Sequence, residues 1–471
     1  MELDIGEFES LPSNKVPGLK KRIMDLIPTL KGHRCSKGYE GGFLERVAEG
    51  TQAGHIVEHV ALELQCLAKI EVGYGKTIDS DIEGIYKVVY RYRDEAVGLK
   101  AGEMAVEIVE SLFKGKDYEI QGKILELKKI RDRYLFGPTT QSIVDEAKKR
   151  GIPFIRLNSE SYVQLGYGVH QRRIQAAMCD NTSAIGVEIA DDKMLTKKIL
   201  RDEGIPVPEG NIVRTIEEAL KLADGIGYPV VVKPLVGNHG RGITINITNP
   251  KDLKIAFTNS IKIHDIVIIE RFLEGYDHRI LVINNKFTAA ARREPTPLVG
   301  DEKSTIKELI DKINQDPRRG IGHEKILTRL EIDDMTLRLL KQKGLELDSV
   351  LEKGERLLLK STANLSMGGI AFDVTDEVHP MIRVMAERIS QIINLNIIGI
   401  DVVAKDLRNP LTSNRGGVVE VNAAPGFRMH LKPFKGRPRM VSKPVIDMLF
   451  PPGSKYTLPT VSYTHLTLPT N

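Results

Sequence analysis

Two apolar segments near the C-terminal end constrain the fold most, because each carries polar side chains within a strand-like run. Residues 397–404 (IIGIDVVA) place Asp401 among branched apolar residues, and residues 417–422 (GVVEVN) end with Glu420 and Asn422. Residues two apart on a strand point to the same face. Carboxylate and amide oxygens are the ligands that Mg²⁺ prefers. The pattern predicts two strands of one sheet that hold magnesium; the alternative is a sheet with a solvated polar face.

Basic residues and glycines further upstream predict where phosphate groups would bind. Lys193 lies at a helix start (ADDKMLTKK), and Lys233 ends the strand YPVVVKPL. A glycine-rich turn follows, in which Gly237, Gly240 and Gly242 would let backbone N–H groups approach phosphate oxygens. Two lysines on separate elements can flank a polyphosphate. Taken alone, the turn is explained at least as well by a hairpin.

Composition excludes several classes of function. The chain has 471 residues, 41% of them hydrophobic and 28% charged, which is typical of a globular protein of two or three domains. The net charge of +5 is the small difference between 68 basic and 63 acidic residues, so no nucleic-acid partner is expected. No apolar run approaches the ~18 residues of a membrane helix, so no membrane partner is expected either. Three scattered cysteines predict a reducing, cytoplasmic location.

The pattern along the chain predicts two domains. Helical stretches with a strand between them predict a smaller α+β domain over residues 1–158. Alternating helices and strands predict a larger α/β domain over residues 159–455, with a charged, helix-like insertion or lid over residues 300–358. Residues 456–471 carry the near-repeat YTLPT/LTLPT and look foreign to the fold.

Together these motifs resemble the ATP-grasp ligases. Lys193, Lys233, the glycine-rich turn, ERFLEG, Asp401 and EVNAAPG occur in the order and spacing of that superfamily. The resemblance implies an α/β fold in which two α+β subdomains clamp ATP, with ATP and Mg²⁺ as cofactors. It assigns ATP to Lys193, Lys233, Gly237, Gly240, Gly242, Glu270, Leu273 and Asp277. It assigns the metal to Asp401, Glu420 and Asn422 and catalysis to Arg292 or Arg293, although a paired arginine can also be a solvated strand end.

The implied chemistry joins a carboxylate to an amine. ATP converts the carboxylate to an acyl phosphate, and the amine then displaces phosphate. Magnesium and cationic side chains stabilise the charge on the transferring phosphoryl group.

A narrower resemblance covers residues 1–455. GGFLERVAEGTQAGHIVEHVALELQ, NHGRG, REPTPLVGD, STANLSMGG and EVNAAPGFRMHL look like the cyanophycin synthetase family. The family implies a ligase that adds L-aspartate to the backbone C-terminus of a cyanophycin (multi-L-arginyl-poly-L-aspartate) primer, and it commonly assembles as a homo-tetramer. His239, Arg279 and Ser366 would bind the polymer or the incoming aspartate; the alternative for each is a surface charge or a loop cap.

The family also has a Mur-ligase-like domain that adds arginine and needs a GKT phosphate loop. No such loop follows residue 455, and VGYGKT (residues 72–77) lacks the first glycine of that motif, so it predicts a turn. We therefore expect a C-terminally truncated member without the arginine-adding domain.

The first domain contains a second candidate site, the H-x-x-E-H sequence of residues 55–59. On a helix, His55 and His59 lie one turn apart and could hold Zn²⁺, while Glu58 could activate water. Glu103 or Glu107 could supply a third ligand. The resemblance suggests a zinc hydrolase that cuts the polymer into primers; the alternative is a polymer-binding helix with hydrogen-bonded histidines.

Two other functions stay open from the sequence. One is an ATP-grasp peptide ligase for another small substrate, such as a glutathione-like or D-alanyl peptide. The other is a polymer-binding or zinc-hydrolase module centred on the H-x-x-E-H helix.

Overall fold

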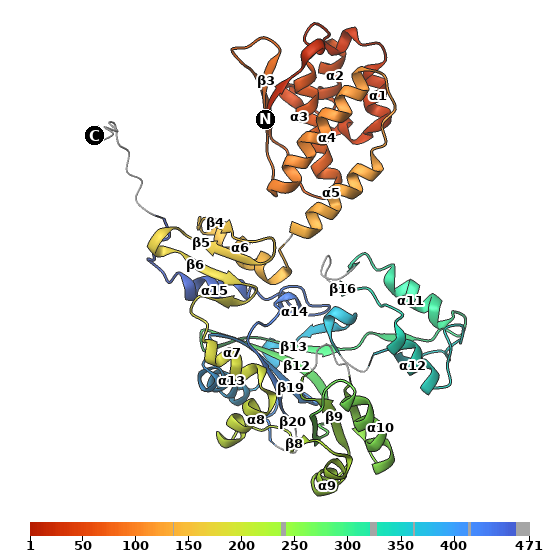
Figure 1. Ribbon diagram of the computed structural model, residues 1–471, viewed down its shortest axis with the longest axis vertical. Coiled ribbons are helices and arrows are strands. Elements are labelled where there is room, and N and C mark those ends of the chain that lie inside the picture. Colours follow the sequence, from red (N-terminus) through yellow and green to blue (C-terminus); the bar gives the residue numbers. More distant parts are fainter. Residues whose placement is uncertain (135, 237–241, 321–326, 361–362, 413–415, 458–471) are drawn as a thin grey trace. The chain divides into compact units, whose positions relative to one another are not determined.

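The computed structural model describes residues 1–134, 136–236, 242–320, 327–360, 363–412 and 416–457. It divides into two compact units, Met1–Leu135 and Phe136–Asn471, which Figure 1 shows in red to orange and in yellow to blue. Each unit has a hydrophobic core of its own. No helix among the described residues is long and apolar enough to cross a membrane.

Unit 1 consists of helices around a small antiparallel sheet. The helices are α1 (Leu19–Leu26), α2 (Gly42–Glu49), α3 (Ala53–Leu67), α4 (Glu95–Phe113) and α5 (Gln121–Tyr134), and the sheet has the order β1 (Glu2–Asp4), β3 (Ile85–Tyr90), β2 (Gly75–Asp79). Apolar residues recur along α3 at helical spacing, and Ile56, Val60 and Leu64 are fully buried. α3 packs against α4 and β3, so it forms the centre of the unit.

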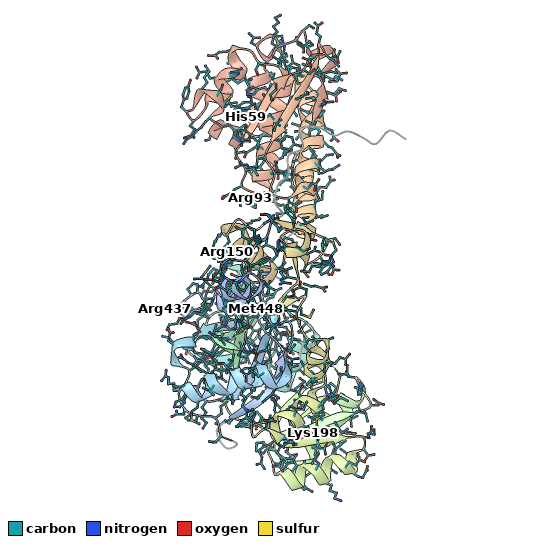
Figure 2. All side chains as sticks on the ribbon, turned by 90° about the vertical axis from the view of Figure 1, so that its left-hand side faces the viewer. His59, Arg93, Arg150, Lys198, Arg437 and Met448 are labelled. Carbon is teal, nitrogen blue, oxygen red and sulfur yellow. The ribbon has the colours of Figure 1, made fainter. Side chains whose placement is uncertain are left out.

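Unit 2 begins with a four-stranded antiparallel sheet. α6 (Pro138–Lys149) precedes β4 (Phe154–Arg156), β5 (Tyr162–Leu165), β6 (Arg172–Gln175) and β7 (Met178–Cys179). The domain boundary expected near Ser159 falls between β4 and β5, which pair directly. α6 packs against α15 (Ser442–Leu449), where Figure 2 labels Arg150 and Met448, and Arg150 donates to Asp447 Oδ1 at 2.7 Å. The segment from residue 136 therefore folds with the C-terminal part of the described chain.

Two further antiparallel sheets carry the candidate site. The smaller has the order β10 (Thr244–Ile247), β9 (Val230–Pro234), β11 (Val267–Arg271), β8 (Gly210–Val213), and it packs on α9 (Ile216–Ile226) and α10 (Pro250–Ile261). The larger has the order β18 (Ile370–Asp373), β13 (Lys286–Glu294), β12 (Tyr276–Ile283), β19 (Ile397–Ala404), β20 (Gly416–Asn422). One of its faces packs on α7 (Ala184–Asp191), α8 (Lys193–Asp202) and α13 (Pro380–Ile393). This arrangement confirms the α/β class predicted from the sequence.

The charged insertion forms a small subdomain between β13 and β18. It contains β14 (Pro297–Val299) paired with β17 (Arg356–Leu358), the short pair β15 (Arg319–Gly320) and β16 (Leu327–Thr328), and the helices α11 (Ile306–Asn314) and α12 (Asp334–Gln342). Ile306, Ile310 and Leu351 belong to a core of its own. The prediction of an insertion between strands is confirmed.

Candidate active site

The register of the large sheet brings the polar strand residues together. β19 lies between β12 and β20, so Asp401 is directly opposite Arg279 on one side and Glu420 on the other. Asn422 lies opposite Gly399, two residues from Asp401. The two strands predicted from their polar side chains are therefore neighbours. Their carboxylate and amide groups meet on β19 and the edge strand β20.

Asp401 is buried and held by two guanidinium groups. Arg279 donates to both of its carboxylate oxygens, with Nη2 3.1 Å from Oδ2, and Arg293 Nη2 lies 3.2 Å from Oδ2. Asn422 Nδ2 lies 3.5 Å from the same oxygen. Burial alone would raise the pKa of Asp401, but the charges of Arg279 and Arg293 outweigh it and lower that pKa. We call Asp401, Arg279, Arg293, Glu420 and Asn422 the carboxylate cluster.

The structure separates the two arginines proposed for catalysis. Adjacent strand residues point to opposite faces. Arg293 shares the face of Asp401 and donates to Asp277 Oδ1 at 2.8 Å. Arg292 instead pairs with Glu294 at 2.9 Å and lies 4.7 Å from the centre of the Tyr276 ring. Of the pair, only Arg293 belongs to the carboxylate cluster.

A second charged group, the lysine cluster, lies on the small sheet and α8. Lys233 on β9 donates to Glu270 Oε1 at 2.5 Å, and Lys197 on α8 donates to Glu270 Oε2. All three residues are buried. Burial would raise the pKa of Glu270, but the two lysines lower it to about 2. Two cations on separate elements thus share one carboxylate at the place expected for phosphate groups.

The lysine on α8 is not the one that the sequence singled out. Lys193 is half-buried at the start of the helix, one turn before Lys197, and the lysine cluster contains Lys197. Both lysines stand in the same DKMLTKK segment, so the helical spacing was visible in the sequence. The contact with Glu270 was not visible, because it joins residues 73 positions apart that only the folded chain brings together.

An open cavity lies next to the segment that follows β11. It has a volume of about 740 Å³ and is lined by Leu273 and Glu274 after β11 and by Lys405, Asn409 and Gly416 near β19 and β20. A cavity of this size can enclose a nucleotide. Leu273, one of the residues that the resemblance assigns to ATP, lines this cavity.

The remaining predicted residues of unit 2 lie outside both charged clusters or outside the described residues. Gly237, His239 and Gly240 lie outside the described residues. Gly242 has φ +72°, and a Cβ atom there would lie 2.4 Å from Ile263 Cδ1, so glycine is required for the turn. Ser366 lies in a short turn, η6 (Leu365–Met367), where it donates to Asn364 Oδ1 at 2.9 Å. Among the described residues, no hydrogen bond joins Ser366 to the carboxylate cluster.

The H-x-x-E-H residues lie on α3, where Figure 2 labels His59. Cys35, His55 and His59 offer ligand atoms that all lie within 4.8 Å of one another, and we call them the histidine cluster. Cys35 Sγ is 3.2 Å from His55 Nε2, and His59 Nδ1 is 2.8 Å from His33 Nδ1. Burial lowers the pKa of His55 to about 4 and that of His59 to about 2, so both are neutral at pH 7 and able to bind a metal.

The third ligand expected for this site is corrected by the structure. Glu103 pairs with Lys100, and Glu107 accepts hydrogen bonds from Tyr118 and Lys123, on an exposed part of α4 and α5. Cys35 stands in their place in the histidine cluster. Glu58 accepts a hydrogen bond from Thr77 at 2.7 Å. It also lines an open cavity of about 620 Å³ that the histidine cluster lines as well.

The fold places the chain in the ATP-grasp class. Residues 192–285 match the carbamoyl-phosphate synthase L chain ATP-binding domain, and residues 1–114 match the cyanophycin synthase-like N-terminal domain. A solved bifunctional glutathione synthetase from Pasteurella multocida aligns with a TM-score of 0.53 and 29% identity over 74% of this chain and 50% of that chain.

The chain belongs to the cyanophycin synthetase family. It is 49% identical to the cyanophycin synthetase of Crocosphaera subtropica and 48% identical to that of Synechocystis, over 98% of this chain and 54% of each relative. A glutathione biosynthesis bifunctional protein from Clostridium perfringens is 31% identical over 72% of this chain and 43% of that protein. The chain spans about half the length of the cyanophycin synthetases it matches.

Proposed function

We propose that the protein is an ATP-dependent carboxylate–amine ligase that adds L-aspartate to the backbone C-terminus of a cyanophycin primer. The observation that carries this proposal is the buried Asp401 between Arg279 and Arg293, with Glu420 opposite it on the next strand. The cyanophycin synthetases to which the chain is related supply the substrate class.

The donor set fits magnesium. Asp401, Glu420 and Asn422 offer carboxylate and amide oxygens, and hard divalent cations prefer oxygen ligands. These residues would hold Mg²⁺, which when bound neutralises phosphate charge. Asp401 is already ionised in the site, since its pKa is lowered by the two arginines, so it needs no proton loss before it can coordinate a cation.

Lysine and arginine side chains of the protein bind the phosphate groups and the substrate carboxylate. Lys197 and Lys233 exchange their shared Glu270 for phosphate oxygens of ATP, which carry more negative charge than one carboxylate. Arg293 and Arg279 orient the substrate carboxylate and stabilise the charge that develops as the phosphoryl group moves to it. Asp277 holds Arg293 in place through a hydrogen bond of 2.8 Å.

ADP release is the direct test of this function. Purified protein is incubated with ATP, Mg²⁺ and L-aspartate, with and without a synthetic aspartyl–arginine primer. The proposal predicts ADP release that requires both aspartate and primer. Release with free amino acids alone would favour a peptide ligase for another small substrate, such as a glutathione-like or D-alanyl peptide, and would contradict the primer-dependent function.

A second candidate function, hydrolysis of the polymer at a bound zinc ion, is favoured by the histidine cluster. Two neutral imidazoles and a thiol within 4.8 Å of one another are ligands that Zn²⁺ prefers. Glu58, on the same helix, would activate water. Metal analysis tests it: the wild-type protein should contain stoichiometric zinc and cleave the primer without ATP, and C35S should lose the metal. If the wild-type protein stays metal-free after incubation with zinc, the hydrolase function is contradicted and a polymer-binding role of α3 is favoured.

From the family resemblance we also propose an oligomeric state and a cellular location. We expect a homo-oligomer, commonly a tetramer, that works on a cytoplasmic storage polymer. Light scattering of the purified protein tests the assembly.

A further inference from the structure

A buried histidine beside the carboxylate cluster has no hydrogen-bond partner for either ring nitrogen. His430 lies in the short helix α14 (Arg428–Leu431) and is 2% exposed. Its backbone groups are satisfied: its N–H donates to Phe427 O at 2.9 Å, and its carbonyl accepts from Arg439 N at 2.8 Å. Both Nδ1 and Nε2 are enclosed and unpaired among the described residues. Buried polar groups are nearly always hydrogen-bonded, so an unpaired ring calls for a missing partner.

The position of α14 places this ring on the reactive face of the large sheet. α14 packs on β13 and β18, and Met429 forms an apolar cluster with Ala291 and Ala371. Ala291 is two residues from Arg293 on β13, so both point to the same face. That face also carries Arg279 and Asp401. His430 therefore lies beside the arginines that hold Asp401.

The charged groups around the ring come from four elements. Arg279 on β12 and Arg293 on β13 act on it as cations, and Asp373 on β18 acts as an anion. Arg439, in the segment after α14, is already paired with Asp373, with Nη2 2.6 Å from Oδ2. Burial first, and then the charge of Arg279, lowers the pKa of His430 to about 3, against the weaker effect of Asp373. The imidazole is neutral at pH 7.

A neutral imidazole offers one donor and one acceptor nitrogen, and the acceptor can also bind a proton. Arg279 and Arg293 have donors only, and the ionised Asp401 that they contact is the proposed metal ligand. The free acceptor nitrogen of His430 can accept a hydrogen bond from a protonated amine, and it can take the proton once nearby negative charge raises the pKa of the ring. A negatively charged acyl phosphate beside the arginines would offset their effect on the ring and make it more basic at the moment it is needed.

We propose, on the basis of the ligase function proposed above, that His430 is a catalytic residue that accepts a proton from the amino group of the incoming aspartate. The aspartate ammonium gives one proton to the free ring nitrogen. The amine nitrogen then forms a bond to the carbonyl carbon of the acyl phosphate, and the carbon–oxygen bond to phosphate breaks with its electron pair on the departing phosphate. The second amine proton goes to that phosphate. His430 returns its own proton to solvent when the products leave.

The test separates formation of the acyl phosphate from attack by the amine. Hydroxylamine is neutral at pH 7 and attacks acyl phosphates without a base, so it reports the first step as a hydroxamate. Full ligation of L-aspartate to the synthetic aspartyl–arginine primer reports both steps. Both rates are measured for the wild type, H430Q and H430A. The matched control is H379N, because His379 caps α13 by accepting from Met381 N and asparagine is also a good N-cap.

The expected result is that ligation falls by about 10²-fold or more in both His430 variants, which is typical for loss of a general base. Hydroxamate formation should stay at the wild-type rate, and the ligation deficit should shrink as pH rises and more aspartate is already deprotonated. H379N should match the wild type in both assays. Equal loss of both rates in H430Q with an unchanged melting temperature, or no loss of ligation in either variant, would overturn the proposal. A wild-type protein that forms no ATP-dependent hydroxamate contradicts the ligase function itself and removes the step on which His430 would act.

Discussion

The two candidate sites differ in how their buried polar side chains are kept in a usable state. In unit 2, Asp401 and Glu270 stay ionised because arginines and lysines surround them. In unit 1, His55 and His59 stay neutral because burial opposes protonation and no carboxylate in the described part of the chain pairs with either. The first arrangement suits exchange of ion pairs for phosphate and a hard cation. The second suits a softer metal bound by nitrogen and sulfur.

The largest expected effect comes from the carboxylate cluster. E420A should abolish primer-dependent ADP release while the melting temperature changes little, because loss of one metal-binding carboxylate is worth several kcal/mol of charge stabilisation. The histidine cluster should keep its metal in the same variant. Wild-type turnover in folded E420A would contradict the metal assignment and the contrast between the two sites.

Arg293 and Arg292 form a matched pair on opposite faces of β13. R293A should lower turnover by about 10²–10³-fold, the usual cost of losing one group that stabilises a developing anion. R292A should leave turnover close to the wild type, since Arg292 contacts Glu294 and Tyr276 away from Asp401. Steady-state kinetics with both variants checks this. Equal losses of turnover in R293A and R292A would contradict the assignment of the catalytic role to Arg293 alone.

Lys197 and Lys193 are a matched pair of lysines on α8, of which Lys197 alone contacts Glu270 among the described residues. K197M should weaken ATP binding by roughly 10- to 100-fold, because a hydrogen bond to a charged group is worth about 1.5–3 kcal/mol. The loss should be smaller at high salt. K193M should bind ATP nearly as well as the wild type, as its side chain is outside the cluster. Calorimetric titration with ATP distinguishes the two, and the reverse order would favour the assignment made from the sequence.

The smallest effect concerns the pH dependence of unit 1. His59 has a folded pKa of about 2 against an ordinary value of 6.5, so below pH 6.5 the unfolded state binds the extra proton first. The free energy of unfolding should therefore fall by a few kcal/mol as pH drops from 6.5 toward 4, because each pH unit in this range costs about 1.4 kcal/mol. The contribution of His59 should not change with pH above 7. H59Q should show a shallower slope in metal-free denaturant titrations. An unchanged slope would place His59 in contact with water.

The two regions also show how far sequence reasoning reaches. Glu420 and Asn422 could be predicted to share a face, because the period of two along a strand is fixed by backbone geometry. Their neighbour Asp401 followed from the same pattern, and the sheet register confirms that the strands pair. The resemblance assigned Asp277 to ATP, whereas its contact with Arg293 across β12 and β13 could not be expected from the sequence.

Long-range packing decided the remaining residues. The choice between Lys193 and Lys197 depends on which turn of α8 meets Glu270. Cys35 lies in a short turn, η4 (Cys35–Lys37), outside the H-x-x-E-H helix, and nothing in the sequence spacing links it to His55. His430 is part of EVNAAPGFRMHL, yet its lack of a partner appears only when α14 is seen against β13.

The most direct test of the central claim is the mass of the primer after reaction. A synthetic aspartyl–arginine primer is incubated with the protein, ATP, Mg²⁺ and isotope-labelled L-aspartate, and E420A serves as the control. We predict a primer heavier by a labelled aspartyl residue at its backbone C-terminus, with one ADP released for each addition and no change in the control. An unchanged primer alongside active ATP turnover, or a mass gain from another amino acid, would contradict the proposed function.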